Sequence, residues 1–274
     1  MPVYRFSPNQ ATADERRRAF VAHQDILKDL LDRVKDFDSA ARHCILVGPR
    51  GIGKTHILLL LADTIEADEN LGPGWVVVRF AEEEYGISTL AELFLRVIES
   101  MAGGNKNINR NADLALAYIS DYCKDHNKHV LLLMDNIQLY LDQFSDVEIG
   151  RMRDILMSKS LFLIIGAAPS YFKQMQGYDE AFYNFFEPIH LEELSHEEAE
   201  EMLRRRADID GAREFIENFE QCRPKIATTS FLTGGNPRLI LMLYQVMCES
   251  AVTEAANAFR HLLDELTPYF QERM

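Results

Sequence analysis

Short apolar runs alternate with longer segments of helical periodicity from residue 43 to about residue 194. Each run has the length of a buried strand, and the segments between runs repeat their apolar residues at helical spacing. Strands that alternate with helices indicate a parallel sheet covered by helices on both faces. The predicted strands are residues 43–47, 75–80, 129–134, 161–165 and 188–191. The predicted helices among them are residues 55–67, 90–101, 112–125 and 147–157.

The two ends of the chain lack this alternation. Residues 1–19 are polar and mixed, and we expect them to form an arm lying on the domain. Residues 20–37 follow as a predicted helix with one apolar stripe, made of Ile26, Leu27, Leu30, Leu31 and Val34. From Ser195 onward the pattern is helical throughout. We therefore predict an α/β part, residues 1–194, and an all-helical part, residues 195–274.

A glycine-rich segment follows the first predicted strand. Residues 48–55 read Gly-Pro-Arg-Gly-Ile-Gly-Lys-Thr and fit the pattern G-x-x-x-x-G-K-[ST] at every fixed position. Between a strand and a helix, such a loop wraps a phosphate with its backbone N–H groups, and the helix N-terminus adds partial positive charge. Lys54 can then reach the β- and γ-phosphates, and the hydroxyl of Thr55 can bind Mg²⁺. The residues expected to bind nucleotide here are Pro49, Arg50, Gly51, Ile52, Gly53, Lys54, Thr55 and His56.

The strand predicted at residues 129–134 ends in Asp135-Asn136. Four or more apolar residues followed by Asp form the second signature of phosphate-loop NTPases, because a buried strand holds the carboxylate rigidly at the sheet edge. Asp135 can then orient Mg²⁺, usually through the water shell of the ion. The alternative is a strand that ends in Asp because Asp is a common turn residue. With the phosphate loop upstream, we predict that Thr55 and Asp135 hold the metal.

Composition narrows the range of partners. The chain has 274 residues and a net charge of −14, which argues against a surface that coats DNA or RNA. A local basic patch could still use the arginine runs at residues 16–18 and 204–206, although such runs are more often solvated helix faces. The four cysteines are widely spread, which favours reduced thiols in a cytoplasmic protein. The apolar runs are too short to span a bilayer, so we expect no membrane association.

Several stretches resemble one family, the AAA+ and closely related STAND-type P-loop ATPases, nearest to the origin-recognition branch and its prokaryotic relatives. Residues 20–24 are similar to the family's Phe-Val-Gly-Arg-Glu box at Phe20 and Val21. Residues 161–170 stand where the family has its sensor 1 strand. Residues 186–195 resemble the last core strand and the entry to a helical lid, and residues 234–238 resemble the sensor 2 region. The resemblance covers nearly the whole chain, with the phosphate loop as its most specific part.

The resemblance implies a fold and further site residues. The fold is a five-stranded parallel sheet in the order 5-1-4-3-2, with helices on both faces and a small helical lid over the nucleotide. Phe20 and Val21 would then lie near the adenine, Pro237 against the adenine or ribose, and Arg238 toward the phosphates. The cofactors implied are ATP or ADP with Mg²⁺.

Three departures from the family pattern make us expect slow hydrolysis. Many relatives have Glu after the metal Asp, whereas this chain has Asn136, which can orient a water but cannot take its proton. Gln138 is another amide that could orient water. Ala167 and Ala168 replace the expected polar residue of sensor 1, and residues 182–186 contain no arginine finger. The residues expected to act in catalysis are Lys54, Asp135, Asn136 and Arg238.

Three functions compete at this stage. The first is an ATPase module that acts as a nucleotide-controlled switch, with slow or partner-stimulated hydrolysis and with a second copy or another protein as partner. The second is a DNA-associated assembly ATPase of the replication-initiator or transposition-regulator type. Residues 262–271 resemble the linker before a winged-helix domain, so its nucleic-acid contacts would come from a further domain or a local basic patch. The third is a small-molecule phosphotransferase, which the helical C-terminal part disfavours.

Overall fold

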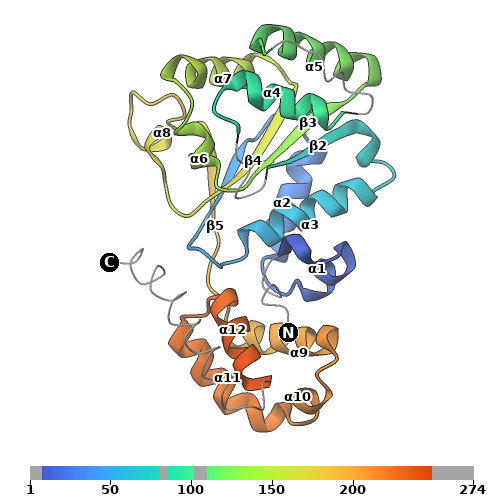
Figure 1. Ribbon diagram of the computed structural model, residues 1–274, viewed down its shortest axis with the longest axis vertical. Coiled ribbons are helices and arrows are strands. Elements are labelled where there is room, and N and C mark those ends of the chain that lie inside the picture. The colour runs from blue at the N-terminus through green and yellow to red at the C-terminus, as the bar shows by residue number, and fades with distance from the viewer. Residues whose placement is uncertain (1–7, 81–85, 102–109, 249–274) are drawn as a thin grey trace. The chain divides into compact units, whose positions relative to one another are not determined.

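The computed structural model describes residues 8–80, 86–101 and 110–248, and contains a five-stranded parallel sheet (Figure 1). The strands lie in the order β2-β3-β4-β1-β5, which confirms the predicted order 5-1-4-3-2. Their bounds are β1 Cys44–Val47, β2 Trp75–Phe80, β3 His129–Met134, β4 Phe162–Ala168 and β5 Glu187–His190. The resemblance stretch 262–271 lies outside the described residues.

Burial follows the position of each strand in the sheet. Every residue of β1 and β4 is buried, since each of these strands has a neighbour on both sides. The edge strand β5 is mostly exposed. Such continuous apolar strands are typical of a parallel sheet with helices on both faces. Val47 of β1 pairs with Ala168 and with His190, so the carboxyl ends of these three strands are level.

The helices begin and end near the predicted bounds. They are α2 Gln24–Lys35, α3 Lys54–Ala67, α4 Leu90–Glu99, α5 Ala112–His126 and α7 Asp146–Ser158, with two short helices that the sequence did not predict, α6 Ile137–Leu141 and α8 Lys173–Gln176. Caps explain several starts: Thr89 accepts a hydrogen bond from the N–H of Glu92, and Ser145 forms a capping box with Glu148. The helix predicted from residue 20 begins only at Gln24, because His23 has a φ of 62° and interrupts it.

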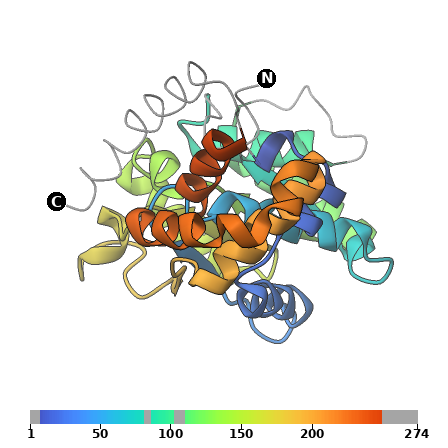
Figure 2. The ribbon, with the colours of Figure 1, turned by 90° about the horizontal axis from the view of Figure 1, so that it is seen from below.

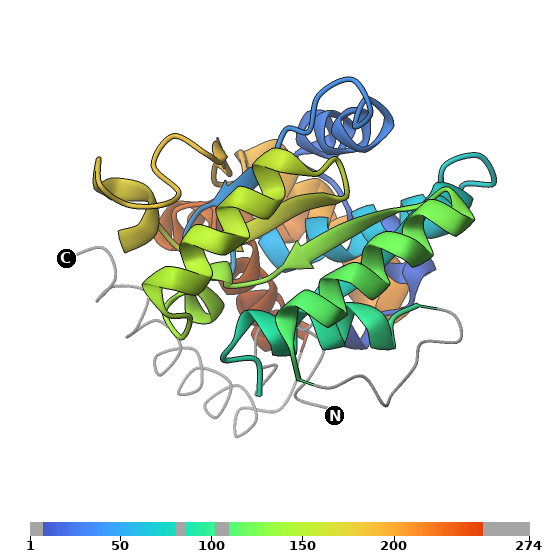
Figure 3. The ribbon, with the colours of Figure 1, turned by 90° about the horizontal axis from the view of Figure 1, so that it is seen from above.

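The described residues form two compact units. One unit contains the sheet and is made of the described residues within 25–47 and 61–190. Its core joins alternate strand residues, such as Val78 and Leu132, to α4, α5 and α7, which lie together on one side of the sheet in Figure 3.

The other unit combines residues 8–24, 48–60 and 191–248. It contains α1 Ala13–Ala19, the phosphate loop, the start of α3, and four helices coloured orange to red in Figure 2: α9 His196–Asp210, α10 Arg213–Glu217, α11 Phe219–Thr233 and α12 Pro237–Cys248. The functional division at Leu194 stays a prediction.

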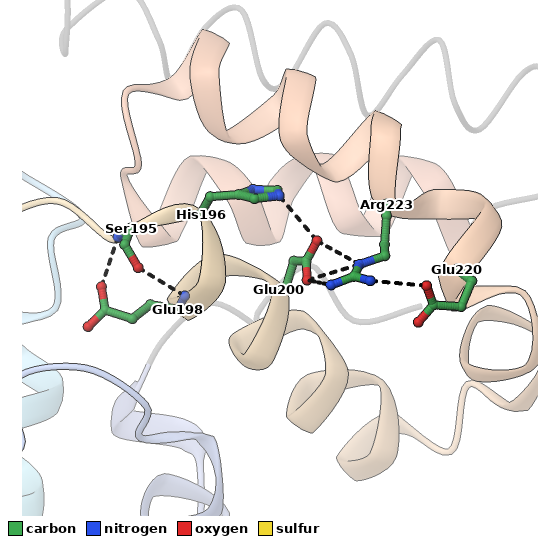
Figure 4. A network of polar contacts seen from close by, with 6 residues as sticks. All are labelled: Ser195, His196, Glu198, Glu200, Glu220 and Arg223. Atoms are coloured by element: carbon green, nitrogen blue, oxygen red, sulfur yellow. Dashed lines mark hydrogen bonds and ion pairs between the residues drawn. The ribbon is translucent and has the colours of Figure 1, made fainter.

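An apolar cluster and a polar network hold the C-terminal helices together. Leu203, Phe215 and Ile240 are among the buried residues of the cluster. At the surface, Glu200 of α9 accepts hydrogen bonds from Arg223 of α11, the closest at 2.8 Å, and lies 3.1 Å from His196 (Figure 4). These hydrogen bonds lower the pKa of Glu200.

Candidate functional site

The phosphate loop has the backbone shape that its glycines allow. Gly51 and Gly53 have φ values of 85° and 112°, a backbone conformation that residues with a Cβ rarely adopt. The N–H of Ile52 donates to the carbonyl of Pro49 at 3.3 Å, and the buried Ile52 side chain anchors this turn. A Cβ placed on Gly53 would meet no atom within 4 Å, so open space adjoins the loop at this residue.

Lys54 begins α3 and folds back against its own loop. The side chain is 7% exposed, and its ammonium group donates to the carbonyl of Gly48 at 2.5 Å and to that of Pro49 at 3.0 Å. The ammonium group is therefore held by carbonyls of its own loop.

The start of α12 contacts the phosphate loop directly, within the same unit. The backbone N–H of Arg238 donates to the carbonyl of Gly51 at 3.2 Å. Asn236 is fully buried and donates through its side-chain amide to the carbonyl of Arg50 at 3.0 Å. The start of α12 is thus held beside the phosphate loop, and the roles of Pro237 and Arg238 toward a nucleotide stay predictions. Asn236 lies in the stretch that resembles the sensor 2 region, but the sequence did not predict it as a site residue; Asn directly before Pro signals a helix start and not a contact with the loop.

The N-terminal segment packs on the beginning of α3. The ring centroids of Phe20 and His56 are 5.7 Å apart, and His56 Nε2 lies 2.8 Å from the carbonyl oxygen of Arg16. Arg205 of α9 donates to the carbonyl of Phe20 at 2.7 Å, and Val21 packs against the apolar cluster of the C-terminal helices. The predicted residues Phe20, Val21 and His56 are therefore in the same unit as the loop.

Both arginine runs take part in contacts within the chain. Arg18 pairs with Asp208 at 2.6 Å, and Arg206 pairs with Asp210 at 2.8 Å. Arg204 lies over the ring of Phe219 with its guanidinium carbon 4.7 Å from the ring centroid. These contacts favour the interpretation of the runs as helix faces.

Asp135 and Asn136 belong to the unit that contains the sheet. Asp135 is 5% exposed and directly follows β3, with its N–H donating to the carbonyl of Phe80 at 3.2 Å. Asn136 has a left-handed backbone with a φ of 48°, and its N–H donates to Oδ1 of Asp135 at 3.1 Å. Oε1 of Gln138 is buried with no hydrogen-bond partner among the described residues. The αL conformation gives a physical reason for Asn in place of Glu, since Asn adopts it at lower cost.

The other departures also have a structural basis. Ala167 and Ala168 lie inside β4 and are fully buried, so the end of this strand carries no polar side chain. Arg151 forms an ion pair with Asp113, and Arg153 donates to the carbonyl of Ala181. Both arginines of α7 are thus engaged within the chain.

The residues fit a nucleotide with Mg²⁺ by their chemistry. Each unit offers an oxygen of the kind that Mg²⁺ prefers, the hydroxyl of Thr55 in one and the carboxylate of Asp135 in the other. The open space at Gly53 adjoins a helix N-terminus suited to phosphate. None of the helices among the described residues is long and apolar enough to cross a bilayer.

The sheet order and the phosphate loop define a P-loop NTPase fold. Comparison with protein families places the chain more closely: residues 36–175 match the AAA domain family, and the chain belongs to it. The sequence is that of an ATP-binding AAA-type module. No curated protein matches the sequence.

Solved structures share the fold at low identity. A Walker-type ATPase of Pyrococcus abyssi is 11% identical, with a TM-score of 0.62 over 94% of this chain and 76% of that one. The ADP form of the ORC2 protein of Aeropyrum pernix is 15% identical, with a TM-score of 0.64 over 91% of this chain and 72% of that one. The ORC1 protein of Aeropyrum pernix, in complex with DNA, is 14% identical, with a TM-score of 0.53 over 70% of this chain and 53% of that one.

Proposed function

We propose that the chain is a nucleotide-controlled switch that binds ATP with Mg²⁺ and hydrolyses it slowly or only when a partner stimulates it. The observation that carries this proposal is the contact between α12 and the phosphate loop. Because Arg238 and Asn236 are bonded to loop carbonyls, a change in the loop on phosphate binding would change the forces on the start of α12. ATP and ADP would then favour different positions of this helix, which is the requirement for a switch.

The residues have distinct proposed roles. Lys54 would leave the carbonyls of its own loop to bind the β- and γ-phosphates, and Thr55 and Asp135 would hold the metal. The guanidinium of Arg238 would report the γ-phosphate. Bound Mg²⁺ would neutralise the charge that develops on the phosphates. Slow hydrolysis follows from Asn136, whose amide can orient a water but cannot accept its proton.

The first test is a calorimetric titration with MgATP. We expect wild-type protein to bind with a Kd on the order of micromolar or tighter. Lys54→Ala should abolish the binding while the chain still folds, because it removes the cation that is proposed to bind the β- and γ-phosphates. Lys173→Ala, on an exposed helical position, is the matched control. Unchanged affinity in Lys54→Ala would refute the assignment of the loop.

A second candidate function is a DNA-associated assembly ATPase. A similar fold occurs in the ORC1 protein of Aeropyrum pernix, which was solved in complex with DNA. The net charge of −14 and the paired arginine runs count against DNA binding by these residues alone. A gel shift together with size-exclusion chromatography, each with and without ATP, separates the two candidates. ATP-dependent assembly on DNA would favour the second.

A further inference from the structure

The connection between α11 and α12 places Asn236 with little freedom. Gly234 ends α11 with a φ of 60°, and Gly235 follows with a φ of 76°. The carbonyl of Gly235 accepts a hydrogen bond from the N–H of Leu194 at 2.9 Å. A Cβ on Gly235 would lie 2.4 Å from the carbonyl oxygen of Leu194, so only glycine fits there. The turn is thus held against the segment before α9, and this fixes the backbone position of the next residue, Asn236.

The side chain of Asn236 does two things at once. Its Oδ1 accepts hydrogen bonds from the N–H groups of Arg238 at 3.1 Å and Leu239 at 3.4 Å, which caps the start of α12. Its Nδ2 donates to the carbonyl of Arg50 at 3.0 Å. An Asp or Ser at this position could cap the helix equally well, but a carboxylate has no proton to donate and a serine side chain is shorter. The contact with the loop therefore requires the amide.

The contact also orients a loop N–H group. In a trans peptide the carbonyl and the following N–H point in opposite directions. Holding the carbonyl of Arg50 toward Asn236 thus holds the N–H of Gly51 away from Asn236. The carbonyl of Gly51 is held in turn by Arg238. Two consecutive peptide groups of the phosphate loop are therefore oriented by Asn236, which caps α12, and by Arg238 in its first turn.

We propose that Asn236 is a positioning residue that presets the Arg50–Gly51 peptide of the phosphate loop for an incoming phosphate and thereby links the loop to α12. The inference rests on the proposed function, since it assigns the phosphate group of a nucleotide as the ligand. The Oδ1 of Asn236 caps α12, and its Nδ2 forms the hydrogen bond to Arg50 that affects the phosphate loop.

The test uses two variants that keep the cap and remove the donor, Asn236→Asp and Asn236→Ser. We expect MgATP to bind Asn236→Ser roughly five- to fiftyfold more weakly than wild type, the effect of one lost hydrogen bond in a partly buried site. Asn236→Asp should bind more weakly still, because it also adds a negative charge beside the loop. The matched control is Asn111→Asp, because Asn111 caps α5 in the same way, with Oδ1 accepting from Asp113 and Leu114. Binding by this control should equal that of wild type.

Amide hydrogen exchange without nucleotide provides a second readout that a purely capping role would not produce. In both Asn236 variants we expect faster exchange in residues 48–55 and unchanged exchange in α9 and α11. An affinity within about twofold of wild type in both variants would overturn the inference, as would faster exchange in α9 and α11 with an unchanged loop. If wild type itself fails to bind MgATP, the proposed function falls, whereas the exchange measurement still decides whether Asn236 holds the loop.

Discussion

The two glycines of the phosphate loop with positive φ are expected to respond differently to the same substitution. Gly51 and Gly53 both have backbones that disfavour a side chain, with φ values of 85° and 112°. Their surroundings differ. A Cβ on Gly51 would lie 2.7 Å from Cβ of Arg238 and 2.8 Å from Oδ1 of Asn236, whereas a Cβ on Gly53 would meet nothing within 4 Å.

These surroundings set the expected magnitudes. Backbone strain alone costs about 1–2 kcal/mol in either alanine variant. Gly51→Ala must also displace the start of α12, because Cβ of Arg238 cannot move without its backbone, and such overpacking costs about 1–3 kcal/mol more. For a chain of this size, that difference corresponds to a melting temperature roughly 2–12 °C lower in Gly51→Ala than in Gly53→Ala.

Differential scanning calorimetry without nucleotide measures this difference, and a MgATP titration completes the comparison. Gly53→Ala should lose nucleotide binding, because its new methyl group points into the open space proposed for the phosphate, and its melting temperature should fall only by the amount that the backbone strain sets. Gly51→Ala should lose both binding and stability. Equal melting temperatures in the two variants would refute the argument that α12 packs on Gly51.

Two further predictions concern ion pairs, one in each unit. Arg33 is 2% exposed and bonds Asp29 and Glu187, which are 42% and 57% exposed. Glu187→Ala is therefore expected to destabilise the protein by about 1–3 kcal/mol, since it leaves a buried donor without one of its acceptors. Arg33→Met should destabilise the protein less, because it leaves two solvated carboxylates. Urea unfolding of both variants measures the two losses of unfolding free energy, and a larger loss in Arg33→Met would contradict the argument. In the other unit, the hydrogen bonds from Arg223 lower the pKa of Glu200, so their stabilising effect is present above the unfolded pKa and is lost as pH falls through the folded one. The melting temperature of Arg223→Gln should consequently fall less than that of wild type between about pH 5 and pH 3, and parallel curves would argue against the pair.

The fold was predictable because its signals are local and repeat along the chain. The strands at residues 75–80 and 129–134 have the predicted bounds, since continuous apolar runs flanked by polar residues leave little choice of register. The sheet order came from the family resemblance, because apolar patterns alone do not determine which strands are neighbours. The short helices α6 and α8 have five and four residues and are below the length at which periodicity is informative.

The candidate site was predictable where one segment carries the chemistry. The loop at residues 48–55 has a pattern of its own, whereas Asn236 acts on the site only through a contact across more than 180 residues, between its amide and the carbonyl of Arg50. The phosphate-loop pattern leaves position 51 free, yet the structure requires glycine there because of the positive φ and the proximity of α12. Contacts between distant segments, which a pattern along the chain cannot express, account for both omissions.

The backbone of Asn136 gives a second reason for slow hydrolysis under the proposed function. In the sequence, Asn136 stands after Asp135 in place of the Glu that many relatives have. In the structure this residue has a φ of 48°, and a Glu there would incur about 1–2 kcal/mol of backbone strain unless the turn after β3 changed. Replacing Asn136 by Glu would therefore supply a general base but would also alter the turn at the start of α6 that positions this residue. The weak hydrolysis that we propose therefore follows from the conformation of this turn as much as from the identity of one side chain. Amide groups would have to orient the attacking water. One of them is Gln138, whose Oε1 is buried and has no hydrogen-bond partner among the described residues.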